Sequence, residues 1–395
     1  MRTVTVVGAS LAGLSAARAL RDQGYDGRLV IVGDEPHRPY DRPPLSKDFL
    51  AGKIEADVLA LEDSDDDLDA EWLLGTRAVC LATRTREVVL SDRTRVRSDG
   101  VVIATGARAR PLPATESLAG VHLLRTLDDA VGLRADLVPG SRLVVIGAGF
   151  IGAEVASTAR ALGLEATVVE AMTTPLAGPL GAEMGAVVSR LHEHHGVRLL
   201  CGTGVSRLAG RQRVEAVELA DGTVLPADVV VVGIGAVPNI EWLIGSGLAL
   251  GNGLECDSEG RTNVSGVVAV GDCASWHEPR LGRPHRVEHW TGALERPATA
   301  VSSLLRGDAG APDLTKSTNA PYFWSDQYDV RIQFAGHAAG ADSVTVEEGS
   351  VESRSLLAVY RRGEVPVAVL AMNQPRLFGR WRRQLNSAAV PTAIH

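Results

Sequence analysis

The stretch 143–162, LVVIGAGFIGAEVASTARAL, has the residue types and spacing of a phosphate-binding turn. An aliphatic run leads into Gly147, Gly149 and Gly152, and an alanine-rich segment of helical character follows. In such a strand–turn–helix unit, the glycines allow a tight turn, a close approach to a pyrophosphate and close helix–strand packing. The helix N-terminus presents free N–H groups to the phosphates. The motif therefore predicts a dinucleotide site.

The opening of the chain, residues 3–20, is a variant of the same motif. TVTVVGASLAGLSAARAL keeps Gly8 and Gly13, but Ser10 stands where the middle glycine is expected. A serine on a strand-to-helix turn could instead be a nucleophile, but that motif needs a glycine at the position of Ala12. We interpret the stretch as a second dinucleotide turn, in which the small Ser10 side chain is tolerated and its hydroxyl can meet a phosphate oxygen.

Each turn is followed by an acidic residue at the end of the next apolar run. Glu170 lies twenty-three residues after Gly147, and Asp34 and Glu35 lie twenty-six and twenty-seven after Gly8. An acid at this distance accepts hydrogen bonds from an adenosine ribose. Glu170 would repel a 2′-phosphate, and residues 171–189 contain no Arg or Lys to hold one, so NADH is expected rather than NADPH. Two nucleotide sites suggest a bound flavin dinucleotide and a diffusing nicotinamide.

Composition and charge exclude several other classes of protein. The chain has 395 residues, 45% of them hydrophobic, and a net charge of −8, so nonspecific nucleic-acid binding is not expected. Its four cysteines form no CxxC pair, which disfavours a zinc site or a dithiol redox centre. We expect no metal; the HEHH stretch 192–195 is interpreted as a solvated helix end. No leader or membrane-length apolar run is seen, so we expect a cytoplasmic protein without membrane attachment.

The order of predicted elements gives an α/β fold of glutathione reductase type. It has two Rossmann-like nucleotide-binding domains and a C-terminal α+β domain, whose strands after Asp313 alternate as in an antiparallel sheet. Buried-strand patterns with glycine- and proline-rich exits suggest the boundaries. We assign 1–112 and 239–314 to the first domain, 113–238 to an inserted second domain, and 315–395 to the C-terminal domain.

Several segments together resemble one family over nearly the whole chain. They include GDEPHRPYDRPPLSKDFLAG (33–52), GAGFIGAEVA (147–156), VGDCA (270–274), RVEHWTGA (286–293) and PYFWSDQYD (321–329). The chain resembles the flavin-dependent ferredoxin reductases that serve bacterial cytochrome P450s and aromatic-ring dioxygenases. YDRPPLSK and FWSDQYD are the most specific of these segments. The resemblance implies FAD on the first turn and NADH on the second.

The resemblance also implies which residues meet each nucleotide. Lys47, in the proline-rich loop, would lie near the flavin and stabilise its reduced, negatively charged form, and Trp324 would lie near the flavin ring; we assign these two to catalysis. The expected FAD contacts are Gly8, Ser10, Leu11, Ala12, Gly13, Asp34, Glu35, Arg42, Lys47, Val79, Ala104, Thr105, Gly106, Arg125, Gly271, Asp272, His289 and Trp290. The expected NADH contacts are Gly147, Gly149, Phe150, Ile151, Gly152, Glu154, Glu170, Gly233, Ile234 and Gly235.

The route by which electrons leave follows from what the sequence lacks. RPPLSK carries no cysteine, so neither a disulfide reductase nor a cysteine-dependent peroxidase is expected. A flavin accepts a hydride and releases electrons singly, so a separate iron–sulfur ferredoxin that feeds a P450 or dioxygenase is the expected acceptor. An acidic ferredoxin needs a locally basic surface. The candidates are the arginines of the last helix, Arg376, Arg380, Arg382 and Arg383.

Two other functions remain open from the sequence. The chain could be an NADH oxidase or a flavoprotein with another acceptor. It could also be an NADH-sensing flavoprotein that signals to partners. The oligomeric state is likewise open between a monomer and a weak dimer.

Overall fold

A five-stranded parallel sheet forms the core of the first nucleotide-binding unit in this computed structural model, which describes residues 1–113, 118–307 and 319–387. In spatial order its strands are β20 (Val267–Ala269), β7 (Gly100–Ile103), β1 (Thr3–Val7), β2 (Arg28–Val32) and β3 (Ala70–Leu73). The edge strand β20 comes from far along the chain, after the whole of the second sheet. The first unit is therefore built from two separated segments.

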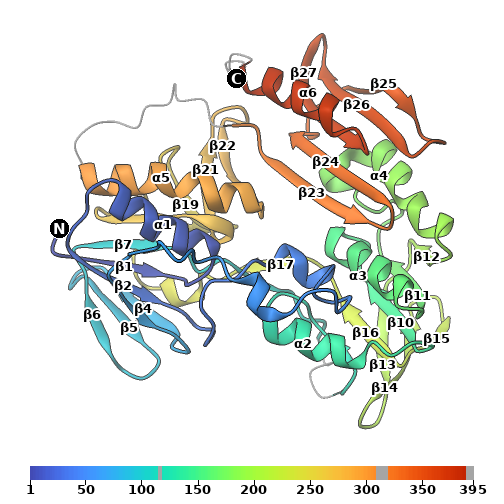
Figure 1. The fold of residues 1–395 in the computed structure, drawn as a ribbon, viewed down its shortest axis with the longest axis horizontal. Coiled ribbons are helices and arrows are strands. Elements are labelled where there is room, and N and C mark those ends of the chain that lie inside the picture. The colour runs from blue at the N-terminus through green and yellow to red at the C-terminus, as the bar shows by residue number, and fades with distance from the viewer. Residues whose placement is uncertain (114–117, 308–318, 388–395) are drawn as a thin grey trace.

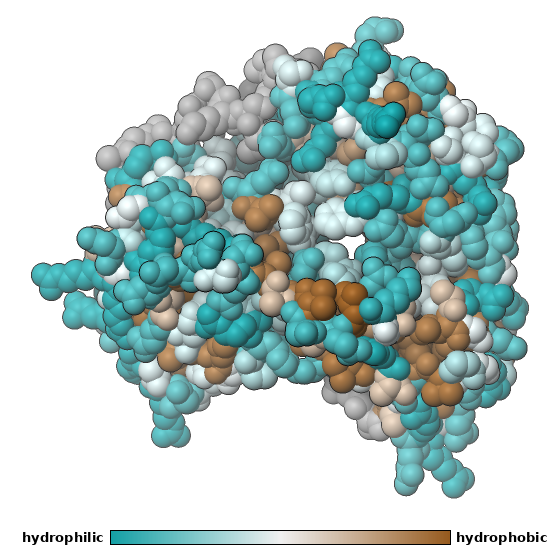
Figure 2. Space-filling model, in the orientation of Figure 1, coloured by the Kyte–Doolittle hydropathy of each residue, from teal (hydrophilic) through white to brown (hydrophobic). Residues whose placement is uncertain are grey.

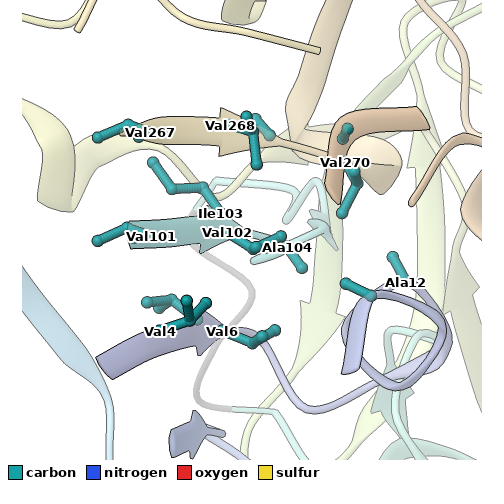
Figure 3. Close-up of a cluster of buried hydrophobic side chains, with 14 of the residues drawn as sticks. Val4, Val6, Ala12, Val101, Val102, Ile103, Ala104, Val267, Val268 and Val270 are labelled. Carbon is teal, nitrogen blue, oxygen red and sulfur yellow. The ribbon is translucent and has the colours of Figure 1, made fainter. Parts of the chain in front are cut away.

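The residues of this sheet are apolar on both faces, as a parallel sheet between two covering layers requires. The strands in Figure 3 contribute Val4, Val6, Val102, Ile103 and Val268, each at most 2% exposed. Helices α1 (Leu11–Asp22) and α5 (Trp290–Arg306) pack together beside the sheet, and Figure 1 shows them in blue and orange. A small antiparallel sheet of β4 (Ala78–Ala82), β5 (Glu87–Leu90) and β6 (Arg95–Arg97) adjoins it.

The second nucleotide-binding unit has its own five-stranded parallel sheet. Its strands are β12 (Arg198–Cys201), β11 (Glu165–Glu170), β10 (Arg142–Ile146), β16 (Val229–Val232) and β9 (Val121–His122). Its helices are α2 (Leu127–Asp136), α3 (Phe150–Ala161) and α4 (Ala177–His194), and a three-stranded sheet follows with β13 (Val205–Gly210), β14 (Val214–Leu219) and β15 (Val224–Pro226).

Short strands join the two units. The antiparallel pair β8 (Ala107–Ala109) and β17 (Ala236–Pro238) stands where the chain leaves the first unit and returns to it. The remaining strands of the first unit are β18 (Leu250–Gly251), β19 (Gly253–Cys256), β21 (Ala274–Glu278) and β22 (Arg283–Arg286).

A five-stranded antiparallel sheet makes up the C-terminal part. In spatial order it contains β23 (Tyr322–Gln327), β24 (Val330–Gly336), β27 (Val365–Met372), β26 (Ser355–Arg362) and β25 (Ser343–Ser350). One face packs on α4 through Leu180, Met184 and Val188, and the other is covered by α6 (Pro375–Ser387). Figure 1 shows the orange strands β23 and β24 of this sheet beside the green α3 and α4.

The predicted fold class is confirmed: two parallel Rossmann-like sheets and a C-terminal α+β part. The division into 1–112, 113–238, 239–314 and 315–395 remains our proposal, and its last boundary lies outside the described residues. Within the described ranges, no helix combines the length and the apolar character that a bilayer crossing demands.

Candidate functional site

The first glycine turn is tightly packed between β1 and α1. Gly8 has a φ of +123°, and a Cβ there would lie 2.0 Å from the carbonyl oxygen of Ala104. A Cβ on Gly13 would lie 1.8 Å from the carbonyl oxygen of Gly8. Ser10 is the N-cap of α1, and its hydroxyl makes no capping bond but accepts a hydrogen bond from Arg42 Nε at 3.2 Å. The residue that replaces the middle glycine thus faces a guanidinium group of the proline-rich loop.

The second turn repeats this geometry between β10 and α3. Gly147 has a φ of +102°, and a Cβ on Gly152 would lie 2.2 Å from the Gly147 carbonyl oxygen. A Cβ on Gly149 would meet no atom within 4 Å, so this side of the turn is open. The carboxylate of Glu170 accepts hydrogen bonds from the backbone N–H groups of Ala148, at 2.9 Å, and Met172, at 2.8 Å. The acid is therefore fixed beside the turn.

Both turns open into one cavity of about 1620 Å³. This exceeds the roughly 300–1,000 Å³ of pockets that hold one drug-sized ligand. On the face drawn in Figure 2, apolar side chains in brown gather around the central hollow. The cavity is lined by every predicted site residue except Gly13, Gly147, Gly152, Glu170 and Ile234. The glycines among these five serve the packing of the turns.

The two acids after β2 have different surroundings. Glu35 accepts a hydrogen bond from Arg42 Nη2 at 2.5 Å and another from the hydroxyl of Tyr40. Asp34 pairs with Arg77 at 2.9 Å and its side chain is 58% exposed. Glu35 is therefore part of a hydrogen-bond network with Tyr40 and Arg42, whereas Asp34 lines the cavity with a largely exposed side chain.

Another charged pair lies deeper along the same wall. Arg125 Nη2 donates to Asp272 at 2.5 Å, and Arg125 Nε donates to the carbonyl oxygen of Ala107 at 2.9 Å. Arg286 donates to the backbone carbonyl of Asp272 at 3.1 Å. The Arg125 bond fixes the carboxylate of Asp272, and the Arg286 bond fixes its backbone, just after β20 in the cavity wall.

Glu154 joins all three parts of the molecule. It lies on α3 of the second unit with its side chain 6% exposed, and Lys47 Nζ of the first unit is 2.6 Å from its carboxylate. Ser46 Oγ donates to the same carboxylate at 2.5 Å, and Ser325 Oγ of the C-terminal sheet donates at 2.7 Å. A buried carboxylate needs such partners. The sequence analysis singled out Lys47 and Glu154 but not Ser325, although Ser325 lies in the specific segment FWSDQYD.

Aromatic side chains line the remaining wall. Phe323 contacts Phe150 with ring centroids 4.7 Å apart and His289 at 5.2 Å. Burial lowers the pKa of His289 to about 4, so its imidazole is neutral at pH 7. The indoles of Trp290 and Trp324 meet edge to face at 5.8 Å. The predicted residues His289, Trp290 and Trp324 are thus brought together.

The HEHH stretch ends α4, and Glu193 and His194 are exposed as the sequence suggested, but His192 and His195 contact the C-terminal part. His192 is 3% exposed, and its Nδ1 is 2.8 Å from the hydroxyl of Tyr328 in the C-terminal part. His195 stacks on the same tyrosine ring at 4.2 Å. The cause is the docking of the β23–β24 turn on α4, a tertiary contact that local sequence does not reveal. Among the described residues, no group of three or more His, Cys, Asp or Glu has a metal-binding arrangement.

Comparisons with known proteins agree with this architecture. Residues 2–296 match the family model of pyridine nucleotide-disulphide oxidoreductases, and residues 322–394 match the reductase C-terminal model. Rhodocoxin reductase of Rhodococcus erythropolis is 39% identical over 95% of this chain and 87% of its own. The ferredoxin–NAD(+) reductase component of the biphenyl dioxygenase system of Paraburkholderia xenovorans is 36% identical, over 95% and 91%.

A solved structure agrees as closely. The covalent putidaredoxin reductase–putidaredoxin complex superposes with a TM-score of 0.92 at 34% identity, covering 98% of this chain and 93% of that one. The family model, the relatives and the shared C-terminal part together show that this chain belongs to the pyridine nucleotide-disulphide oxidoreductase family, among its ferredoxin reductases.

Proposed function

We propose that this oxidoreductase transfers a hydride from NADH to bound FAD and passes electrons singly to a separate iron–sulfur ferredoxin that serves a P450 or an oxygenase. The observation that carries the proposal is the single cavity shared by both glycine turns, because it lets two dinucleotides meet. Among the described residues that line it there is no cysteine, so no thiol there can take the electrons. Of the relatives named above, one is a rhodocoxin reductase and another is the ferredoxin–NAD(+) reductase component of a dioxygenase system, which supports the proposal.

The residues present fit both dinucleotides. On the first turn, Leu11 and Ala12 open α1 and line the cavity, so their backbone N–H groups would hold the pyrophosphate of bound FAD. On the second, Gly149 leaves open space at the start of α3. Bound FAD supplies the conversion between a two-electron donor and a one-electron acceptor. We assign the FAD contacts predicted from the sequence to the region around the first turn, and the NADH contacts to the region around the second turn.

The chain's own residues orient the nucleotides and set the charge around them. Lys47 places a positive charge in the cavity wall, and its ion pair with Glu154 of the second unit holds the ammonium group in position. Arg42, bonded to both Ser10 and Glu35, fixes the proline-rich loop against the first turn. Glu170, pinned by two backbone N–H groups, favours a ribose hydroxyl over a 2′-phosphate.

We propose that ferredoxin docks on α6. Arg376, Arg380 and Arg383 are exposed on this helix, so they can face an acidic partner. Arg382 is different: its guanidinium lies over the ring of Tyr322 at 4.4 Å and near Glu295. Tyr322 in turn stacks on Trp324 at 6.0 Å. The proposed surface therefore lies at the outer end of a row of rings that starts in the cavity.

A charge-matched pair of triple variants tests this docking. We expect Arg376→Gln, Arg380→Gln and Arg383→Gln together to slow ferredoxin reduction at low ionic strength and to flatten its salt dependence. The control replaces Arg84, Arg86 and Arg93, which are exposed on the β4–β6 sheet, far from α6 in Figure 1. Equal rates and equal salt dependence in the two triples would refute docking on α6.

We also propose that the reaction takes place in the cytoplasm. The four cysteines, Cys80, Cys201, Cys256 and Cys273, are free thiols in the structure, which fits a reducing compartment. Cell fractionation with an antibody against the chain tests this assignment.

A further inference from the structure

Asp41 was not among the predicted site residues, yet its carboxylate lines the cavity and has a specific partner there. The indole Nε1–H of Trp290 donates to Asp41 Oδ1 at 2.8 Å, across 249 positions of sequence. Burial raises the pKa of Asp41, whereas the bond from Trp290 and the charge of Lys47 act in the opposite direction. The bond therefore compensates part of the cost of placing a carboxylate in this wall.

The loop holds Asp41 in place on both sides. Its own backbone N–H donates to the carbonyl oxygen of Leu59 at 2.8 Å. The preceding side chain, Tyr40, accepts a hydrogen bond from the backbone N–H of Leu127 at 2.9 Å. The following one, Arg42, donates to the carbonyl oxygen of Arg125 at 2.6 Å. A carboxylate on such a fixed stretch can define the position of the group bound to it.

Trp290 connects Asp41 to the C-terminal part of the molecule through a ring contact with Trp324. It is the first residue of α5, and its ring meets that of Trp324 edge to face, with an interplanar angle of 76°. Trp324 lies on β23 between Trp290 and the stacked ring of Tyr322. Since edge-to-face contacts have a preferred geometry, rotation of one indole moves the favoured position of the next.

We propose that Asp41 is a positioning residue that holds the indole of Trp290 and thereby sets the ring orientation of Trp324 at the inner end of the row leading to α6. Without its acceptor, the Trp290 side chain is free to leave its rotamer. The kinetic consequence rests on the proposed function, because it concerns the delivery of electrons to ferredoxin. The structural consequence does not.

Fluorine NMR of protein labelled with 5-fluorotryptophan tests the structural part. The chain has six tryptophans, and Trp290→Phe and Trp324→Phe assign the two resonances of interest. We expect Asp41→Leu to shift and broaden both resonances, and Asp41→Asn, which retains an acceptor oxygen, to leave both near their wild-type positions. Asp48→Leu, at an exposed carboxylate of the same loop, is the control and should also change neither.

A mutant cycle separates positioning from general loosening. In the Trp290→Phe background, Asp41→Leu should produce no further change at Trp324, because the residue through which it acts no longer has a donor. Asp41→Ser, which is smaller and cannot reach the indole, replaces Asp41→Leu if the leucine variant does not fold. The proposal would be overturned if neither Asp41→Leu nor Asp41→Ser changed the Trp324 resonance. It would also be overturned if the Asp41 substitution shifted this resonance as much in the Trp290→Phe background as in the wild-type protein.

The kinetic arm uses the FAD-loaded protein. We expect Asp41→Leu to slow ferredoxin reduction about tenfold, since small misplacements of reacting groups cost this much or more. Asp41→Asn, which retains an acceptor oxygen, should restore ferredoxin reduction. An unchanged ferredoxin rate in Asp41→Leu overturns the positioning role. A wild-type protein that does not reduce ferredoxin refutes the proposed function instead, and leaves the NMR result standing.

Discussion

Replacing Glu154 by leucine removes a carboxylate that binds all three parts of the molecule. Its distance of 2.6 Å from Lys47 Nζ corresponds to an attraction of roughly 6 kcal/mol at an effective dielectric constant of about 20. Desolvation of both groups offsets part of this, but the variant leaves Lys47, 18% exposed, without its counter-charge. Breaking a buried pair in this way costs about 3–5 kcal/mol. The hydroxyls of Ser46 and Ser325 also lose their acceptor.

Urea unfolding of Glu154→Leu measures this cost against an exposed pair in the same loop. Asp48 and Lys53 lie 3.2 Å apart with side chains 58% and 70% exposed, so Asp48→Leu should lower the free energy of unfolding by at most about 1 kcal/mol. Adding Lys47→Met to Glu154→Leu should recover part of the loss, because the cation that lost its ion-pair partner is then removed as well. If Glu154→Leu costs no more than Asp48→Leu, the reasoning about this junction is wrong.

Three further predictions concern the turns and the histidines. Gly13→Leu should abolish flavin retention because its Cβ would lie 1.8 Å from a backbone oxygen, whereas Ser10→Gly should retain the yellow flavin absorbance; full occupancy in Gly13→Leu contradicts the site. Glu170→Ala should bring the kcat/KM for NADPH closer to that for NADH, and an unchanged ratio would count against its role. Burial lowers the pKa of His289 and His337 to about 4, below the 6.5 of unfolded histidine, so the folded state binds fewer protons and stability should fall as pH drops from 6.5 toward 4. His337→Leu should weaken this pH dependence of the unfolding free energy, and an unaltered slope would refute the assignment.

The glycine motifs were sufficient to predict much of the fold, whereas the family resemblance supplied most of the residues expected around the cavity. Two strand–turn–helix units fixed the two parallel sheets, because each glycine motif needs a strand before it and a helix after it. The turn geometry explains why Gly13 and Gly152 matter although neither lines the cavity: each lets its helix approach the turn. These are short-range requirements, and sequence shows them directly.

The remaining site residues depend on contacts between parts of the chain that are far apart. Ser325 reaches Glu154 across 171 positions, and Asp41 reaches Trp290 across 249. Both residues lie in segments that carry the family resemblance, YDRPPLSK and FWSDQYD, but a serine in a strand and an aspartate in a loop are ordinary, so residue type alone assigns them no role. The same reason accounts for the wrong interpretation of His192, which the C-terminal turn buries. The roles of such residues can be recognised only from the contacts between the domains.

The most direct test of the account mixes the purified FAD-loaded protein with NADH, an acidic ferredoxin and cytochrome c in the absence of oxygen. The account predicts that NADH bleaches the flavin absorbance rapidly and that cytochrome c is then reduced at a rate that depends on the ferredoxin concentration. Rapid bleaching with cytochrome reduction that is independent of ferredoxin would contradict the proposed acceptor. An absence of bleaching by NADH would contradict the meeting of two dinucleotides in one cavity.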